Sequence, residues 1–245
     1  MADFMIISCV TTRYLPNLSH ISRIAEVDQC IILDLTPTPD RNRNSFINRN
    51  TIVDQRTLNR HWITVPINRE RGQVVCGIHI SEGERLWRRK HIQMLSHFYP
   101  NHNDIAPGFI ASLDDILRSC TGSLISLNYN ILCHLLQLLA PDVPLPRFQS
   151  EFGIAHTNSH RTELALLLGA KVYRAGIVEA QILSEDPYVS EFRSAGIEIS
   201  ISKNLAEIGI VDELFVKTSC VHSILTSGVE STRDLVRQAV HCLRN

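Results

Sequence analysis

An arginine-rich segment, residues 41–71, contains the side chains best suited to bind an anion. It carries seven arginines against two acids, a local excess of five positive charges, and it opens with RNRNSFINRN at 41–50. Guanidinium groups bind carboxylate or phosphate oxygens in a bidentate way, and asparagines add neutral donors and acceptors. No lysine or aromatic ladder accompanies them, which favours a small anion such as a nucleotide sugar over a long polyanion. The alternative is a solvated loop whose asparagines cap turns.

A second candidate is NLSH, residues 17–20, which lies between an expected buried strand and an expected helix. Many nucleotidyl-transferring α/β enzymes carry His-x-Gly-His in this context, where the imidazoles and the helix N-terminus stabilise charge on phosphates. Only His20 matches, because Asn17 and Ser19 stand at the first and third positions. An N-terminal cap by Asn17 or Ser19 beside an ordinary surface histidine is the alternative.

Histidine and cysteine spacing does not predict a metal site or a cofactor. His156 and His160 are four residues apart, as metal-binding pairs on a helix are, and we expect an exposed pair at a helix start. Thr157 stands where a metalloprotease needs glutamate, and no third ligand is evident nearby. The seven cysteines form no CxxC pair and lie mostly in apolar runs, which is typical of reduced thiols in a cytoplasmic protein. Cys9 ends an apolar strand, where a buried thiol is expected to be inert.

The elements that must position these residues follow an α/β pattern. A buried strand (4–10), an amphipathic helix (18–27) and a second buried strand (30–35) predict a βαβ unit with parallel strands. Segments 61–67 and 73–80 predict a hairpin, and apolar residues at helical spacing predict helices over 86–99, 110–120 and 123–140. After the break PDVPLP (141–146), strands and helices alternate again.

The whole pattern predicts one α/β domain over residues 1–245, with a Rossmann-like, mainly parallel sheet. Its core is expected to comprise 1–83 and 143–245, and 84–142 to form a helical insertion in the middle of the chain. The net charge of −1 argues against general nucleic-acid binding, and no window of about 18 apolar residues predicts a membrane span. A homodimer is left open.

Several motifs resemble the WbqC-like family of bacterial proteins. They are Tyr14-Leu15-Pro16, Leu33-Asp34, Asn48-Arg49-Asn50, Trp62-Ile63-Thr64-Val65-Pro66, Lys90-His91 and Tyr99, in the family's order. A weaker second half follows, with FQSEF (148–152), Leu168-Gly169-Ala170, Tyr173 and Gly176. The chain departs from the family at Val10-Thr11-Thr12, where the family has His-Gln-Pro. It also departs at Gln149, which replaces a serine, and at His222, which replaces an aspartate.

The resemblance implies a biosynthetic role in surface-glycan, including O-antigen, or secondary-metabolite pathways. Acyl or aminoacyl transfer to an amino sugar or a related small molecule is the expected activity. A non-catalytic ligand-binding or partner protein derived from the family is the alternative, and the missing histidine at position 10 favours it. The expected ligand is an anionic small molecule, either a nucleotide sugar or a carrier-bound acyl group.

We expect the ligand at the carboxyl ends of the first two strands. His20 and Asp34 are the acid–base candidates. The expected ligand contacts are Arg13, Tyr14, Asn48, Arg49, Asn50 and Trp62.

Overall fold

The computed structural model describes residues 4–38, 46–68, 70, 72–81, 83, 86–120, 122–183, 188–203 and 205–244. Residues 41–45, which form the first half of RNRNSFINRN, lie outside the described residues, as do Arg69 and Arg71.

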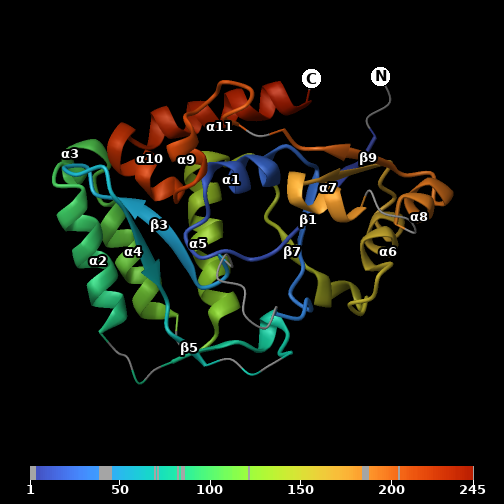
Figure 1. Cartoon of the computed structure of the whole chain (residues 1–245), viewed down its shortest axis with the longest axis horizontal. Helices are drawn as coiled ribbons and strands as arrows, with labels where there is room; N and C mark the ends of the chain where they lie inside the picture. The colour runs from blue at the N-terminus through green and yellow to red at the C-terminus, as the bar shows by residue number, and fades with distance from the viewer. Residues whose placement is uncertain are drawn as a thin grey trace.

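A five-stranded parallel sheet forms the centre of the molecule (Figure 1). Its order is β7-β2-β1-β8-β9. The strands are β1 (Ile6–Val10), β2 (Gln29–Ile32), β7 (Arg147–Phe148), β8 (Val172–Ala175) and β9 (Glu198–Ile201). β1 and β2 pair in parallel across α1 (Leu18–Ala25), which confirms the predicted βαβ unit and the Rossmann-like α/β fold.

Alternate residues of the central strands enter two separate apolar cores. Ile7, Cys9, Ile31 and Leu33 belong to one core, in which helix α6 (His160–Leu167) also packs. Val10, Cys30 and Ile32 belong to the other, larger core, together with the apolar face of α1. This division follows from the two-residue period of a strand, and it explains why both strands read as continuous apolar runs.

The middle of the chain is helical, as the periodicity predicts. It contains α2 (Trp87–Phe98), α3 (His102–Ile105), α4 (Phe109–Ser119) and α5 (Leu124–Leu139). These helices lie on the opposite side of the sheet from α6, α7 (Ile177–Leu183) and α8 (Tyr188–Ser194) (Figure 1). α9 (Glu213–Val216), α10 (Cys220–Ser227) and α11 (Val229–Arg244) end the described chain, and α11 packs on α1 and α5.

The predicted hairpin of 61–67 with 73–80 is wrong in its main pairing. β4 (Arg60–Thr64) pairs antiparallel with β3 (Arg49–Val53), a strand that the residue pattern did not predict. Only β5 (Ile67–Asn68) pairs with β6 (His79–Ile80), and Val75–Gly77 form a 3-10 helix. The prediction failed because β3 begins with polar residues, Arg49 and Asn50. Its apolar part is then too short to indicate a strand.

None of the helices in the described part of the chain is long and apolar enough to cross a membrane.

Candidate functional site

The strand order reverses direction between β1 and β8, and a pocket of about 420 Å³ lies at this point. From β1 the chain proceeds to β2 on one side, whereas β8 and β9 lie on the other. Residues that end or follow β1, β2, β8 and β9 line the pocket, so it lies at the carboxyl ends of the strands. Open α/β sheets place their ligands at such a switch point, and the volume is in the range of small-molecule sites. We call it the pole pocket.

Among the charged side chains that line the pole pocket, cations outnumber carboxylates. Four cations, Arg13, Arg23, Arg161 and Lys203, line it together with one carboxylate, Glu179. The described wall therefore carries three more positive than negative groups. Such a surface favours an anionic ligand, because a partly enclosed charge is screened less than one in open water.

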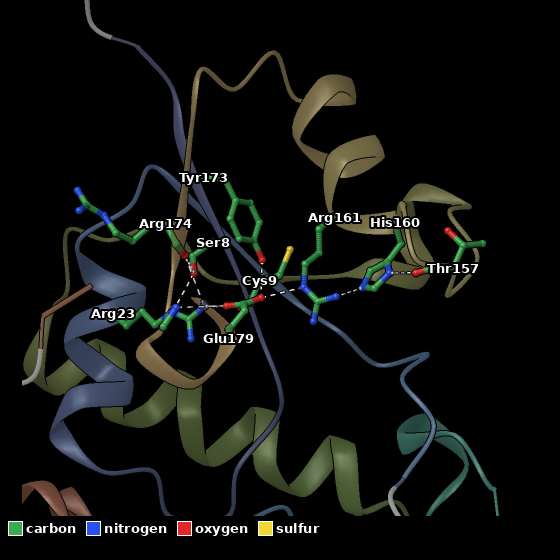
Figure 2. A network of polar contacts seen from close by, with 10 residues as sticks. Ser8, Cys9, Arg23, Thr157, His160, Arg161, Tyr173, Arg174 and Glu179 are labelled. Atoms are coloured by element: carbon green, nitrogen blue, oxygen red, sulfur yellow. Dashed lines mark hydrogen bonds and ion pairs between the residues drawn. The ribbon is translucent and has the colours of Figure 1, made fainter. Parts of the chain in front are cut away.

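Glu179 is the centre of a buried polar network (Figure 2). Its Oε1 accepts hydrogen bonds from the Tyr173 hydroxyl at 2.7 Å and from Arg161 Nε at 2.8 Å. Its Oε2 accepts from Arg23 Nη2 and from the backbone N–H of Gly176. Burial by itself raises the pKa of Glu179, but Arg23 and Arg161 outweigh burial and hold that pKa below its usual value.

The network fixes two guanidinium groups on opposite sides of one carboxylate (Figure 2). Arg23 also donates from Nε to Ser8 Oγ at 3.0 Å and from Nη2 to the Cys9 carbonyl at 2.8 Å. Arg161 Nη1 contacts His160 Nε2 at 3.1 Å. Arg23 Nη1 and Arg161 Nη2 make no hydrogen bond within the described residues, so each side chain retains a donor nitrogen for a ligand.

Gly176 is required by the close approach of Arg23. A Cβ built on Gly176 would overlap Arg23 Nη1 and lie 3.0 Å from its Cζ, closer than van der Waals contact allows. Any other residue at position 176 would displace this guanidinium group from its place in the network.

His20 and Cys9 line the pocket as uncharged groups. Burial, with Arg13 and Arg23 nearby, lowers the pKa of His20 well below 6.5, so its imidazole is neutral at pH 7. Burial, and next the charge of Glu179, raises the pKa of Cys9 to about 12, which keeps it a thiol. Arg13 stays protonated, because burial and Arg23 lower its pKa only to about 10.

Of the residues expected to contact the ligand or move a proton, the structure brings only Arg13 and His20 to the pole pocket. His20 is in the first turn of α1, and its backbone N–H donates to the Asn17 side chain at 3.0 Å. Asn17 thus serves as the N-terminal cap, which was the alternative interpretation of NLSH. The same alternative placed His20 on the surface, but its side chain is buried.

Asn48 and Asn50 support the backbone around β3, whereas Arg49 packs on Trp62. Asn50 is buried, and its Nδ2 donates to the Leu15 carbonyl at 2.6 Å, where Leu15 has a positive φ of 44°. Asn48 Nδ2 donates to the Val65 carbonyl at 2.9 Å. The Arg49 guanidinium lies 4.3 Å from the centre of the Trp62 ring.

Tyr14 and Asp34 are buried in hydrogen bonds within the protein. The Tyr14 hydroxyl pairs with His91 Nδ1 at 2.8 Å, and His91 Nε2 pairs with the Thr64 carbonyl at 3.1 Å. A carbonyl only accepts, so His91 carries its proton on Nε2 and accepts from Tyr14. Asp34 Oδ1 accepts from the backbone N–H of Ser150 at 3.0 Å, which joins β2 to the segment after β7.

Trp62 lines a different pocket from Arg13 and His20, between β4 and α2. The expected contacts are thus divided between two pockets and the backbone around them.

The pair His156 and His160 shows no metal-binding arrangement. Their rings lie 4.5 Å apart, but His160 is buried, not exposed as expected, and its Nδ1 contacts the Thr157 carbonyl. Among the residues that the structure describes, no group of three His, Cys, Asp or Glu side chains could hold a metal ion.

Sequence reasoning missed Arg23, Arg161, Glu179 and Lys203. Arg23 and Glu179 are 156 positions apart, so no local motif joins them. A signal was present in Tyr173-x-x-Gly176-x-x-Glu179, a tyrosine, a glycine and an acid at regular spacing where a strand passes into a helix. Tyr173 and Gly176 were already noted as family elements, without the carboxylate that both contact.

The parallel sheet and the cationic pocket at its switch point define an α/β protein of the Rossmann-like class with a candidate anion site. The chain belongs to the WbqC-like protein family, whose model matches residues 12–208. No curated protein and no solved structure matches the chain.

Proposed function

We propose that the pole pocket binds an anionic small molecule, either a nucleotide sugar or a carrier-bound acyl group. The observation that carries the proposal is the excess of positive charge at the switch point of the sheet, with two guanidinium groups held by Glu179. Arg13 and Lys203 form no ion pair within the described residues, so both remain available to the ligand. Asp34 has no place in this proposal, because it is not among the residues that line the pole pocket.

We further propose that the chain transfers an acyl or aminoacyl group to an amino sugar or a related amine, in surface-glycan or secondary-metabolite biosynthesis. The amine nitrogen would attack the thioester carbonyl of the donor, so that a C–N bond forms and the C–S bond breaks. The proton leaves the amine and ends on the thiolate, giving an amide and a free thiol. Neutral His20 is the group in the pocket that would carry this proton.

A non-catalytic ligand-binding protein is the second candidate, and two observations favour it. Val10 lines the pocket at the position where the family has a histidine. Glu179 already accepts four hydrogen bonds, so its carboxylate is poorly placed to take a further proton from a substrate.

Binding is tested by thermal shift against nucleotide sugars and acyl-carrier thioesters, with Arg13→Gln and Arg60→Gln as matched variants. Arg60 is exposed on β4 in the arginine-rich segment and lines neither pocket. The stabilisation by a ligand should be lost in Arg13→Gln and retained in Arg60→Gln. A ligand shift that survives Arg13→Gln would place the ligand elsewhere.

Turnover separates the two candidates. An enzyme should release free thiol from the thioester in the presence of an amine, and His20→Gln should abolish this release while the ligand still shifts the melting temperature. A ligand that binds but is never consumed would support the non-catalytic protein.

A further inference from the structure

A second pocket, of about 570 Å³, lies between β4 and α2 and shares no lining residue with the pole pocket. Trp87, Lys90, His91 and Met94 line it from one face of α2, at the i, i+3, i+4 and i+7 spacing of a helix. Trp62 and Thr64 line it from β4, and Leu86 borders it. We call it the tryptophan pocket.

Large apolar side chains remain exposed around this hollow. Trp62 is 48% exposed and Leu86 is 61% exposed. Apolar side chains grouped around a concavity mark a binding surface, whereas single exposed ones are ordinary. Such a group beside a formed pocket is what a small-molecule site requires.

Trp62 is held in place without being buried. The Arg49 guanidinium lies over its ring, and the Phe46 ring lies 6.0 Å away at a tilt of 37°. A fixed, half-exposed indole ring presents a surface for stacking that loses little conformational freedom when a ligand binds. With Arg49 already over the ring and Lys90 in the wall, a second cation would be repelled there.

Lys90 supplies the charge of the tryptophan pocket. Its side chain is exposed and forms no ion pair within the described residues, and it lies one turn beyond Trp87 on α2. His91 contributes no charge, because burial lowers its pKa to about 4 and both of its ring nitrogens are occupied within the protein.

We propose that the tryptophan pocket is a second small-molecule site, which takes a planar aromatic ring that carries an anionic group. The ring stacks on Trp62 between Leu86 and Met94, and the anion pairs with Lys90. A nucleotide and an aromatic acid share this chemistry. The proposal does not rest on the function assigned to the pole pocket.

Phe46 connects the two sites. Its ring contacts that of Trp62, and the Arg13 guanidinium lies 5.5 Å from the centre of the same ring. Phe46 therefore packs against one lining residue of each pocket, although it lines neither of them.

The chain has two tryptophans in all, Trp62 and Trp87, and both line this pocket. Intrinsic fluorescence therefore reports on it directly. The probes are adenosine 5′-monophosphate and benzoate, with inorganic phosphate and acetate as anions without a ring. We expect a saturable change in emission with one of the aromatic probes and none with the ring-free anions. The probe that binds more tightly distinguishes a nucleotide from an aromatic acid.

Single substitutions test whether the change in emission comes from a ligand bound in the tryptophan pocket. Lys90→Gln should weaken binding about three- to fivefold, as the loss of one exposed charge pair would. Lys171→Gln, at an exposed lysine before β8, should leave binding unchanged. Trp62→Leu should weaken binding at least about fivefold, read from the remaining Trp87.

Arg13→Gln separates this inference from the pole pocket, because it should weaken binding there at least about tenfold and leave the benzoate response intact. The proposal is overturned if neither aromatic probe changes the emission, if phosphate or acetate changes it equally, or if Lys90→Gln and Lys171→Gln bind alike.

Discussion

Replacing Glu179 with glutamine tests whether the buried carboxylate holds the two guanidinium groups. The change keeps the size of the side chain and removes its charge. One amide oxygen can still accept from Tyr173 and Arg161. The amide nitrogen, however, would face Arg23 and the Gly176 N–H, so two hydrogen bonds become contacts between donors.

The expected loss follows from these contacts. A hydrogen bond to a charged group contributes about 1.5–3 kcal/mol, so the loss of two costs about 3–6 kcal/mol. The Glu179 side chain is 13% exposed, and water that reaches it moderates the loss. We therefore expect Glu179→Gln to lower the free energy of unfolding by about 3 kcal/mol, a melting temperature about 6–12 °C lower for a chain of this size.

Urea unfolding at several pH values is the assay, with Glu230→Gln as the matched control. Glu230 pairs with Arg233, but its side chain is 76% exposed, so its loss should cost under about 1 kcal/mol. The folded pKa of Glu179 is below the usual value of about 4.5. Its stabilisation is therefore complete above pH 4.5 and is lost as the pH falls through the folded pKa. The difference in the free energy of unfolding between wild type and Glu179→Gln should be largest at pH 7 and should shrink below pH 4.5.

Two results would refute this reasoning. One is a loss in Glu179→Gln no larger than that in Glu230→Gln. The other is a difference from wild type that stays constant between pH 7 and pH 3, since the loss would then not depend on the charge of Glu179.

Three further predictions concern the surroundings of the two pockets. Gly176→Ala should cost about 1–3 kcal/mol in calorimetric unfolding, because its Cβ would displace Arg23. Asn50→Ala should cost about 1–3 kcal/mol, since it leaves buried carbonyls unpaired, and more than Asn48→Ala, which removes one hydrogen bond from a partly exposed side chain. Burial lowers the pKa of His91 from 6.5 to about 4, so it stabilises the fold above pH 6.5 and less as the pH falls toward 4. In urea unfolding, wild type should take up about one more proton on unfolding than His91→Gln does between pH 4 and pH 6.5. The free energy of unfolding of His91→Gln should therefore depend less on pH in that interval.

Each of these predictions has a control or a contrary result. Gly83→Ala should be nearly neutral, because no described atom lies within 4 Å of its Cβ position. An equal loss of unfolding free energy in Asn48→Ala and Asn50→Ala would mean that the size of the loss does not depend on how deeply the asparagine is buried. An unchanged pH dependence in His91→Gln would show that this histidine is not held neutral.

The first βαβ unit was predictable because the sequence patterns that indicate its strands and helix are local. IISCV and QCII are mostly apolar runs, and Leu18, Ile21 and Ile24 repeat at helical spacing, so β1, α1 and β2 follow from neighbouring residues. Gly169 follows the C-cap of α6 with a φ of 68°, the left-handed conformation that glycine commonly supplies after a helix.

The candidate site was harder to predict, because its contacts join residues far apart in sequence. Charge counting led to the arginine-rich segment, whereas the arginines that pair with Glu179 come singly from α1 and α6. Asn50 has the polar character of a ligand contact, yet it supports the strained backbone of Leu15. Local composition does not show which polar side chains face a pocket and which satisfy a buried carbonyl.

Calorimetric titration of wild type, Arg13→Gln and Arg60→Gln is the sharpest test of whether the pole pocket binds an anionic small molecule. The titrant is the nucleotide sugar or carrier thioester that gives the largest thermal shift. We expect binding at least about tenfold weaker in Arg13→Gln, because one charge-assisted hydrogen bond is lost, and unchanged binding in Arg60→Gln. Equal affinity in all three proteins would contradict it.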